Sequence, residues 1–288
     1  MHILLLGKNG QLGWELCRTL APLGTVTALD FEELNLEDFT AVRKTIRELK
    51  PQVIVNASAY TAVDKAESES EKCFAINGTI PGILAEETLE LNAALLHFST
   101  DYVFDGAKGS PYDEDDSPNP LNVYGKSKLA GEQAVQAVGC NHLIVRTSWV
   151  YSLRKGGFVN KILEWARDNE TLRIVSDQIA NPTWARMLAE VSSQILARGT
   201  CYLDDRKGLY HLAGYGYTSR FDWTQKIIEL DPEKHLQKVK QILPALSSDF
   251  PTPAQRPLFS ALDCSKFSNA FGLQLPPWEK VLSYALEK

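Results

Sequence analysis

The chain has 288 residues, 44% hydrophobic and 23% charged, which is an ordinary composition for a protein with a packed core. Its net charge of −6 argues against nucleic-acid binding, which needs clustered lysine and arginine, but it is compatible with one phosphorylated ligand. Five scattered cysteines without a C-x-x-C pair favour neither disulfides nor a zinc site. No apolar stretch is long enough for a signal peptide or a membrane span, so we expect a cytoplasmic protein that does not bind membranes.

The first half of the chain alternates short apolar runs with longer segments of helical period, which predicts βαβ units and a parallel sheet. Nearly continuous apolar runs are typical of strands buried on both faces. We therefore predict an α/β fold with a Rossmann-like, doubly wound parallel sheet. Its expected strands are residues 2–6, 25–29, 52–56, 93–99 and 142–146.

The alternation loosens after residue 149, which predicts a smaller α/β substrate-binding domain over 153–288, after a cofactor-binding domain over 1–152. A possible strand at 172–176 and an amphipathic stretch at 183–196 suggest that residues near 172–197 return to the first sheet. A series of prolines from Asp231 onward favours loops and short elements over a second large sheet.

A glycine-rich turn, Gly-x-x-Gly-x-x-Gly, separates the first predicted strand from a helical pattern that begins at Leu12. Glycines permit a tight turn and close backbone approach, so a cofactor pyrophosphate can sit at the helix N-terminus. Packing of the strand against the helix is the alternative explanation. The predicted cofactor-binding residues in the turn are Gly7, Asn9, Gly10, Gln11, Leu12 and Gly13.

Asp30 ends the second predicted strand, where an acidic side chain commonly accepts hydrogen bonds from the adenosine ribose. An acid there repels a 2′-phosphate, but Lys8 in the glycine turn offsets that repulsion, so both NADPH and NADH remain open. An ordinary surface carboxylate is the alternative. Asp38 and Phe39 are expected to flank the adenine. The small residues Ala57, Ser58 and Ala59 are expected to let the nicotinamide half of the cofactor approach the backbone.

Tyr124 and Lys128 are four residues apart and share one helix face, so the cation is expected to lower the phenol pKa from about 10 toward neutrality. Tyrosine–lysine pairs at this spacing also arise by chance, so the position must supply the specificity. This pair opens a helical pattern after the strand that ends at Thr100, and strand ends line the crevice of open α/β sheets. Thr100 is therefore expected to place its hydroxyl on the carbonyl oxygen that Tyr124 protonates, a local turn bond being the alternative.

Five segments resemble the extended short-chain dehydrogenase/reductase family and, within it, the dTDP-4-dehydrorhamnose reductases. They are GKNGQLG at 7–13, TAVDKAE at 61–67, STDYVFDG at 99–106, PLNVYGKSKLAGE at 120–132 and RTSWVY at 146–151. The resemblance implies NADPH- or NADH-dependent reduction of the C4 keto group of a dTDP-4-keto-6-deoxy-L-sugar to dTDP-L-rhamnose. In it, Thr100, Tyr124 and Lys128 form the catalytic trio.

The resemblance also implies substrate contacts. Val63, Asp101, Tyr102 and Trp149 fall around the sugar, Arg256 is a candidate for the diphosphate, and Asn77 falls where related reductases carry a helix asparagine. A core residue is the alternative interpretation of Trp149, and a surface loop cation is the alternative for Arg256. The segment at 179–181 departs from the family, which often has a glycine there, and this puts the local loop shape in doubt.

Some members of the family hold Mg²⁺ between subunits, and Glu15 and Glu190 occupy the matching positions. The resemblance thus implies a Mg²⁺-bridged homodimer, with a monomer as the alternative, although exposed helix carboxylates are the usual case. Two further functions remain open. One is a related sugar-nucleotide epimerase or fucose-type synthase, which needs the same tyrosine and lysine. The other is a non-catalytic regulatory subunit on the same fold.

Overall fold

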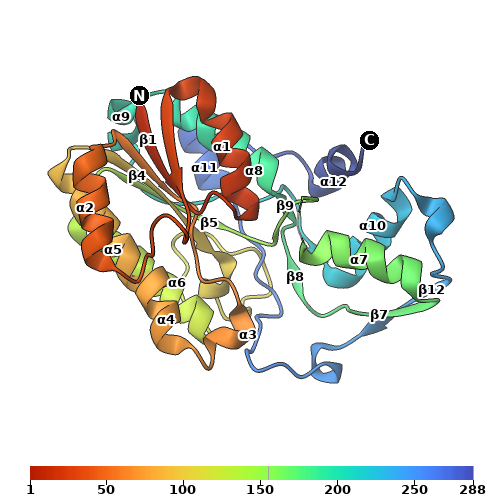
Figure 1. Cartoon of the computed structure of the whole chain (residues 1–288). Helices are drawn as coiled ribbons and strands as arrows, with labels where there is room; N and C mark the ends of the chain where they lie inside the picture. The colour runs from red at the N-terminus through yellow and green to blue at the C-terminus, as the bar shows by residue number, and fades with distance from the viewer. Residues whose placement is uncertain (155, 288) are drawn as a thin grey trace.

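A computed structural model describes residues 1–154 and 156–287, and a six-stranded parallel sheet forms the centre of its larger lobe (Figure 1). The strand order is β10-β5-β4-β3-β1-β2. The strands are β1 (His2–Leu6), β2 (Thr25–Leu29), β3 (Val53–Asn56), β4 (Ala94–Thr100), β5 (His142–Thr147) and β10 (Gly208–His211). The chain adds β2 on one side of β1. It then adds β3, β4, β5 and β10 in turn on the other side, so the topological switch point lies between β1 and β3.

Helices cover both faces of this sheet, as the continuous apolar strands require. In β1, Ile3 and Leu5 enter one hydrophobic core, whereas Leu4 and Leu6 enter the other. The first core includes side chains of α1 (Gln11–Thr19), α8 (Ala185–Leu196) and α11 (Ser265–Phe271). The second includes side chains of α2 (Phe39–Leu49), α5 (Ile80–Glu90) and α6 (Val123–Val138). The predicted doubly wound α/β fold is therefore confirmed.

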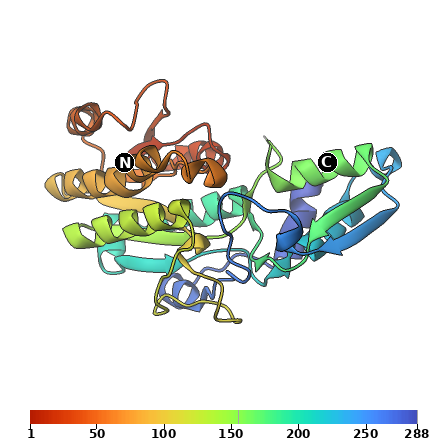
Figure 2. The same ribbon diagram turned by 90° about the horizontal axis from the view of Figure 1, so that it is seen from below.

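The smaller lobe lies beside the large sheet in both views (Figures 1 and 2). It contains a two-stranded parallel sheet of β7 (Thr171–Val175) and β12 (Gln241–Ala245). The helices α7 (Gly157–Asp168), α10 (Arg220–Leu230) and α12 (Trp278–Leu286) pack there around a core that includes Ile162, Leu172, Trp223 and Leu282.

The strand predicted at 172–176 exists as β7, but it pairs with β12 and does not return to the large sheet. The burial pattern explains this difference: alternate residues of β7 are exposed, whereas every residue of β4 and β5 is buried. The sixth strand of the large sheet is β10 instead. Three elements that follow residue 152, namely α8, β10 and α11, pack in the larger lobe. The predicted division into a cofactor-binding domain over 1–152 and a substrate-binding domain over 153–288 therefore stays a prediction.

Shorter elements connect the two lobes and form the loops. They are α3 (Val63–Ala66), α4 (Ser70–Phe74), a π-helical turn η2 (Ala75–Thr79), α9 (Thr200–Asp204), the 3₁₀ turns η1 (Ala21–Leu23), η3 (Asp101–Val103), η4 (Lys234–Leu236) and η5 (Ser247–Asp249), and the strands β6 (Val150–Tyr151), β8 (Ile179–Ala180), β9 (Thr183–Trp184) and β11 (Thr218–Ser219). Of the helices within 1–154 and 156–287, none has the length and apolarity that a membrane span needs.

Candidate active site

The glycine turn between β1 and α1 requires glycine at two positions. Gly7 has a φ of +87°, and a Cβ on Gly13 would lie 1.9 Å from the Gly7 carbonyl oxygen. The turn therefore lets α1 begin directly above the end of β1. In the described chain, α1 has no side-chain cap at Gly10 and no acidic residue in its first turn, so its first N–H groups remain available to an anion.

A cavity of about 530 Å³ extends from the glycine turn to α6. Its wall contains most of the predicted cofactor-binding and catalytic residues, together with two predicted substrate-binding residues, Asp101 and Trp149. The cofactor-binding and catalytic ones are Gly7, Asn9, Gly10, Gln11, Leu12, Asp30, Ala57, Ser58, Ala59, Thr100, Tyr124 and Lys128. Gly13 supports the turn from beneath. The sequence analysis missed Thr61, Phe98, Ser99, Thr147, Ser148 and Val150, which also line it. Several of these follow strand ends, and that position is the signal that points to them.

A smaller cavity of about 130 Å³ shares Gly7, Asp30, Ser58 and Ala59 with the larger one. Its wall is largely apolar and includes Leu34, Asn35, Leu36 and Ile76. The predicted adenine contacts, Asp38 and Phe39, do not line it. The Asp38 side chain instead caps α2 by accepting a hydrogen bond from the Ala41 N–H at 2.9 Å, and Phe39 begins that helix. Residues 34–36 line the smaller cavity, and the assignment of Asp38 and Phe39 to the adenine stays a prediction.

These features fit a dinucleotide cofactor. Among the residues that the structure describes, the buried Gln11 Oε1 and Thr147 Oγ1 have no hydrogen-bond partner, and both residues belong to the wall of the larger cavity. Buried polar atoms normally have partners. The uncapped start of α1 suits a pyrophosphate. The two unpartnered polar atoms suit a polar group such as the nicotinamide ribose, and the adjoining apolar cavity suits an adenine.

Thr100 and Tyr124 lie at the two ends of one loop on the wall of the larger cavity. Thr100 is the last residue of β4, and Tyr124 is in the first turn of α6, which Asn122 caps by accepting a hydrogen bond from the Gly125 N–H at 2.8 Å. The Tyr124 ring meets the edge of Tyr102, with 5.9 Å between ring centroids. Lys128, one turn further along α6, is 2% exposed and completes the predicted trio.

The structure corrects the expected direction of the Tyr124 pKa. Burial raises this pKa well above its usual value, and a hydrogen bond with Thr100 opposes only part of the shift. Burial also lowers the pKa of Lys128 to about 8, opposed by the charge of Glu132. The ammonium donates to the Phe98 carbonyl oxygen at 2.6 Å. Desolvation therefore outweighs the predicted effect of the cation on the phenol, and Tyr124 stays protonated, which is the state a proton donor needs.

A buried ion pair fixes the base of this site. Glu132 accepts hydrogen bonds from Arg146 Nε at 2.9 Å, from Arg146 Nη2 at 2.7 Å and from Ser99 Oγ at 2.5 Å. These contacts join α6, β5 and β4. Lys128, one turn before Glu132 on α6, and Thr100, next to Ser99 on β4, are thereby held on rigid elements.

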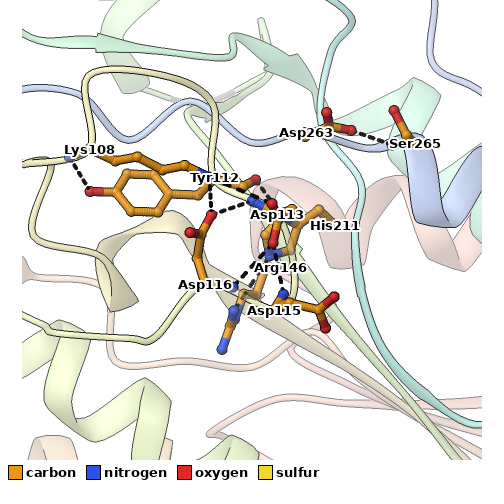
Figure 3. Close-up of polar contacts among 9 residues, drawn as sticks. All are labelled: Lys108, Tyr112, Asp113, Asp115, Asp116, Arg146, His211, Asp263 and Ser265. Carbon is orange, nitrogen blue, oxygen red and sulfur yellow. Dashed lines mark hydrogen bonds and ion pairs between the residues drawn. The ribbon is translucent and has the colours of Figure 1, made fainter.

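The loop between Thr100 and Tyr124 is anchored to the edge of the sheet by the polar contacts drawn in Figure 3. The Tyr112 carbonyl oxygen accepts a hydrogen bond from His211 Nδ1 at 3.1 Å, which leaves His211 Nε2 to accept from Arg146 Nη1 at 3.4 Å. Burial, with the Arg146 charge, lowers the pKa of His211 to about 3, so the ring is neutral, as this pattern requires. The Tyr112 hydroxyl donates to Asp105 at 3.0 Å, and Lys108 pairs with Asp116.

Asn77 fixes another wall of the cavity from the π-helical turn η2. Its Oδ1 accepts a hydrogen bond from the Tyr60 N–H at 2.8 Å, and its Nδ2 donates to the Tyr60 carbonyl oxygen at 3.0 Å. Nδ2 also donates to Ser127 Oγ at 3.1 Å. The buried amide therefore ties the loop after β3 to α6, one residue from Lys128.

Asp101 is a buried carboxylate next to Thr100. It accepts hydrogen bonds from Ser260 Oγ at 2.5 Å, Ser148 Oγ at 3.0 Å and Thr100 Oγ1 at 3.2 Å. Burial raises its pKa to about 6, although these three hydroxyls oppose the shift. Asp101 thus holds the Thr100 hydroxyl and ties it to the segment around Ser260.

Trp149 joins this cavity to the smaller lobe. Its φ of 38° is unusual for a residue other than glycine, and its ring stacks on Trp223, with 5.5 Å between centroids. The Arg220 guanidinium carbon lies 3.6 Å from the centre of the Trp149 ring. Trp149 is therefore both part of the cavity wall and part of the packing of the smaller lobe. Arg220 was not predicted from the sequence.

Arg220 lines a second cavity, of about 590 Å³. Its wall includes Arg220, Arg256, Phe158, Phe250, Thr252 and Gln255. Arg256 is held there by Asp64, at 2.8 Å, and by Thr252 Oγ1, at 2.6 Å. The predicted substrate residues Val63 and Tyr102 are half-buried at α3 and η3, and neither lines a described cavity, although Tyr102 contacts the Tyr124 ring.

The predicted Mg²⁺ ligands lie on two helices that pack together, α1 and α8, but arginines occupy their surroundings. Glu190 accepts a hydrogen bond from Arg186 Nε at 2.9 Å. Burial and the charge of Glu190 raise the pKa of Glu15, whereas Arg186, Arg18 and Arg154 lower it. In the described part of the chain, no group of three or more metal-ligating side chains occurs. Glu190 is already paired with Arg186, and a carboxylate held by a cation is a poor ligand for Mg²⁺, so these residues do not support the Mg²⁺ assignment.

A family model described as "RmlD substrate binding domain" matches residues 1–288. The dTDP-4-dehydrorhamnose reductase of Escherichia coli (strain K12) is 42% identical over 284 residues, covering 97% of this chain and 95% of that protein. This chain belongs to the dTDP-4-dehydrorhamnose reductase family. A family structure from Clostridium acetobutylicum has a TM-score of 0.91 and 33% identity, covering 99% of this chain and 98% of the other. Another, from Bacillus anthracis and in complex with NADP, has a TM-score of 0.88 and 33% identity, with 98% and 97% coverage.

Proposed function

We propose that this chain reduces the C4 keto group of dTDP-4-dehydro-L-rhamnose, giving dTDP-L-rhamnose, with NADPH or NADH. The observation that carries this proposal is the convergence of Thr100, Tyr124 and Lys128 on the wall of the cavity that starts at the glycine turn. The activity named for the Escherichia coli relative agrees with it. One cavity thus contains both the glycine turn that would hold a cofactor and the acid, Tyr124, that would protonate the substrate.

When bound, the reduced nicotinamide supplies the hydride to the sugar carbonyl carbon. Tyr124 donates its phenolic proton to the carbonyl oxygen, and the Thr100 hydroxyl turns from Asp101 to donate a hydrogen bond to the same oxygen. Positioned proton transfer of this kind contributes about 10²–10⁴-fold to a rate. Lys128, whose ammonium is buried beside this wall, is proposed to bind the nicotinamide ribose hydroxyls and to balance the phenolate left after transfer. Solvent then returns a proton to Tyr124.

The second cavity is proposed to bind the dTDP part of the substrate. Arg220 and Arg256 provide two cations for the diphosphate, and Phe158 and Phe250 provide apolar walls for a base. Burial lowers the pKa of Arg220 to about 10, which still leaves it charged at neutral pH. Because Trp149 lies against Arg220, the sugar would bridge the two cavities along the indole.

The test is oxidation of NADPH and NADH at 340 nm with dTDP-4-dehydro-L-rhamnose, together with identification of the sugar product. Tyr124→Phe is expected to lower kcat by at least about 100-fold while cofactor binding is retained. Tyr210→Phe is the matched control, because Tyr210 is a buried tyrosine whose hydroxyl donates to the Arg206 carbonyl oxygen, away from the cavity.

The outcomes also separate the alternative functions. An epimerase would convert the sugar without net oxidation of the cofactor. A regulatory subunit would bind cofactor and leave the sugar unchanged. Turnover that is the same in Tyr124→Phe and in the wild type would overturn the role of Tyr124.

A further inference from the structure

An exposed ion pair lies at the adenosine end of the cofactor cavity. Lys8, in the glycine turn, donates through Nζ to Glu33 Oε1 at 2.5 Å. The other carboxylate oxygen of Glu33 accepts a hydrogen bond from the Asp30 N–H at 3.0 Å. Glu33 therefore connects the glycine turn after β1 to the turn after β2.

Asp30 lies between these two turns in a fixed orientation. Its Oδ2 accepts a hydrogen bond from the Asn9 N–H, and its Oδ1 accepts one from the Phe31 N–H, both at 2.8 Å. Asp30 also lines both the larger and the smaller cavity. An acid in this position accepts hydrogen bonds from the adenosine ribose, so the 2′-hydroxyl of a bound cofactor is expected beside Asp30 and its neighbours.

The charges around this ribose position decide whether a 2′-phosphate is tolerated. Asp30 and Glu33 are both negative, and the cation beside them is Lys8, which extends from the glycine turn to Glu33. The hydrogen bond with Glu33 raises the pKa of Lys8, and the same contact lowers the pKa of Glu33, so both are charged at neutral pH. With Lys8 engaged by Glu33, a 2′-phosphate meets two carboxylates and a cation already paired.

We propose that Glu33 is the residue that makes this chain prefer NADH to NADPH, because it holds Lys8 away from a 2′-phosphate. The inference rests on the proposed function in requiring a cofactor in this cavity. The side chains of Lys8 and Glu33 are 29% and 41% exposed, so the pair is accessible to solvent and can open. NADPH is accepted when Lys8 leaves Glu33, and loss of the Glu33 charge makes Lys8 permanently available.

The test measures binding of two cofactor fragments, 5′-AMP and 2′,5′-ADP, by isothermal titration calorimetry. Glu33→Gln is expected to tighten 2′,5′-ADP about tenfold and to change 5′-AMP less than about twofold, because one like charge is removed and one cation is freed. Lys8→Gln is expected to weaken 2′,5′-ADP about tenfold. In the double variant, the gain from Glu33→Gln is expected to shrink to the part that comes from removing the like charge, because no cation is freed.

Glu32→Gln is the matched control, since Glu32 is the exposed neighbour of Glu33 and loses the same charge in the same turn. Equal effects of Glu33→Gln on both fragments, an equal effect of Glu32→Gln, or a Lys8→Gln variant with unchanged 2′,5′-ADP binding would each overturn the proposal. If neither fragment binds the wild type, the assignment of this cavity as the cofactor site is wrong. If fragments bind with this pattern but the sugar is not reduced, only the proposed function fails.

Discussion

The buried ion pair of Glu132 and Arg146 allows a quantitative prediction. Both side chains are at most 4% exposed, and the carboxylate accepts two hydrogen bonds from Arg146 and one from Ser99. Glu132→Gln removes the negative charge and leaves the Arg146 guanidinium buried without an ionic partner. Breaking a buried pair in this way costs about 3–5 kcal/mol. At roughly 2–4 °C per kcal/mol, the expected fall in Tm is about 6–20 °C.

The assay is denaturant unfolding of Glu132→Gln, Arg146→Gln and the double variant. Because each single change strands the other partner, the double variant is expected to lose less stability than the sum of the two. The control is Glu170→Gln, which breaks an exposed pair with Lys240 and is expected to cost less than about 1 kcal/mol. A Glu132→Gln protein within about 1 kcal/mol of the wild type would refute the reasoning.

The same substitution has an effect on catalysis. The Glu132 charge opposes the lowering of the Lys128 pKa by burial. Without that charge, the Lys128 pKa falls further below about 8, so Lys128 loses its proton at a lower pH. The alkaline fall in kcat is therefore expected to begin at lower pH in Glu132→Gln than in the wild type. An alkaline limb at the same pH in both proteins would show that Lys128 does not control it.

Three further predictions concern the cavity and the metal assignment. Burial raises the pKa of Asp101 to about 6, so kcat/KM for the sugar is expected to fall below that pH in the wild type and to lose this limb in Asp101→Asn. A limb that persists in the variant belongs to another group. Trp149→Ala is expected to raise the KM for the sugar nucleotide about tenfold, because the indole lines the cavity. It is also expected to lower the free energy of unfolding by about 3 kcal/mol, because the indole stacks on Trp223. An unchanged KM would assign Trp149 to packing alone. Treatment with EDTA is expected to leave turnover and the size-exclusion elution volume unchanged, since Arg186 occupies Glu190 and the described residues hold no group of three metal-ligating side chains. Recovery of a lost activity by Mg²⁺ would contradict this.

The sequence predicted the elements whose signal is local. The run of residues 3–6 is apolar throughout, and this pattern occurs where a strand is buried on both faces, as β1 is. The glycine turn was predictable because its backbone geometry admits few other residues. Tyr124 and Lys128 were predictable because a strand end and a helix start bring them to the same crevice.

Other features depend on contacts between distant segments, and no local pattern reveals these. Arg220 reaches Trp149 only because α10 packs beside β6 in the smaller lobe. Asp38 and Phe39 stay a prediction as adenine contacts, because an aspartate before a helix can either bind a ligand or cap the helix, and the sequence does not distinguish these outcomes. The position of β10 in the large sheet was likewise missed, since a four-residue strand carries little periodic signal.

Burial acts on the two titrating residues of the trio in opposite directions, and this suits reduction near neutral pH. It raises the pKa of Tyr124 and lowers that of Lys128 to about 8. At pH 7 the phenol therefore keeps its proton, and most of the ammonium keeps its charge. The resting site holds a proton ready for the carbonyl oxygen and a cation to balance the phenolate that follows. Oxidation of the alcohol would instead need the phenolate at the start, so we expect the reverse reaction to require a higher pH than the reduction.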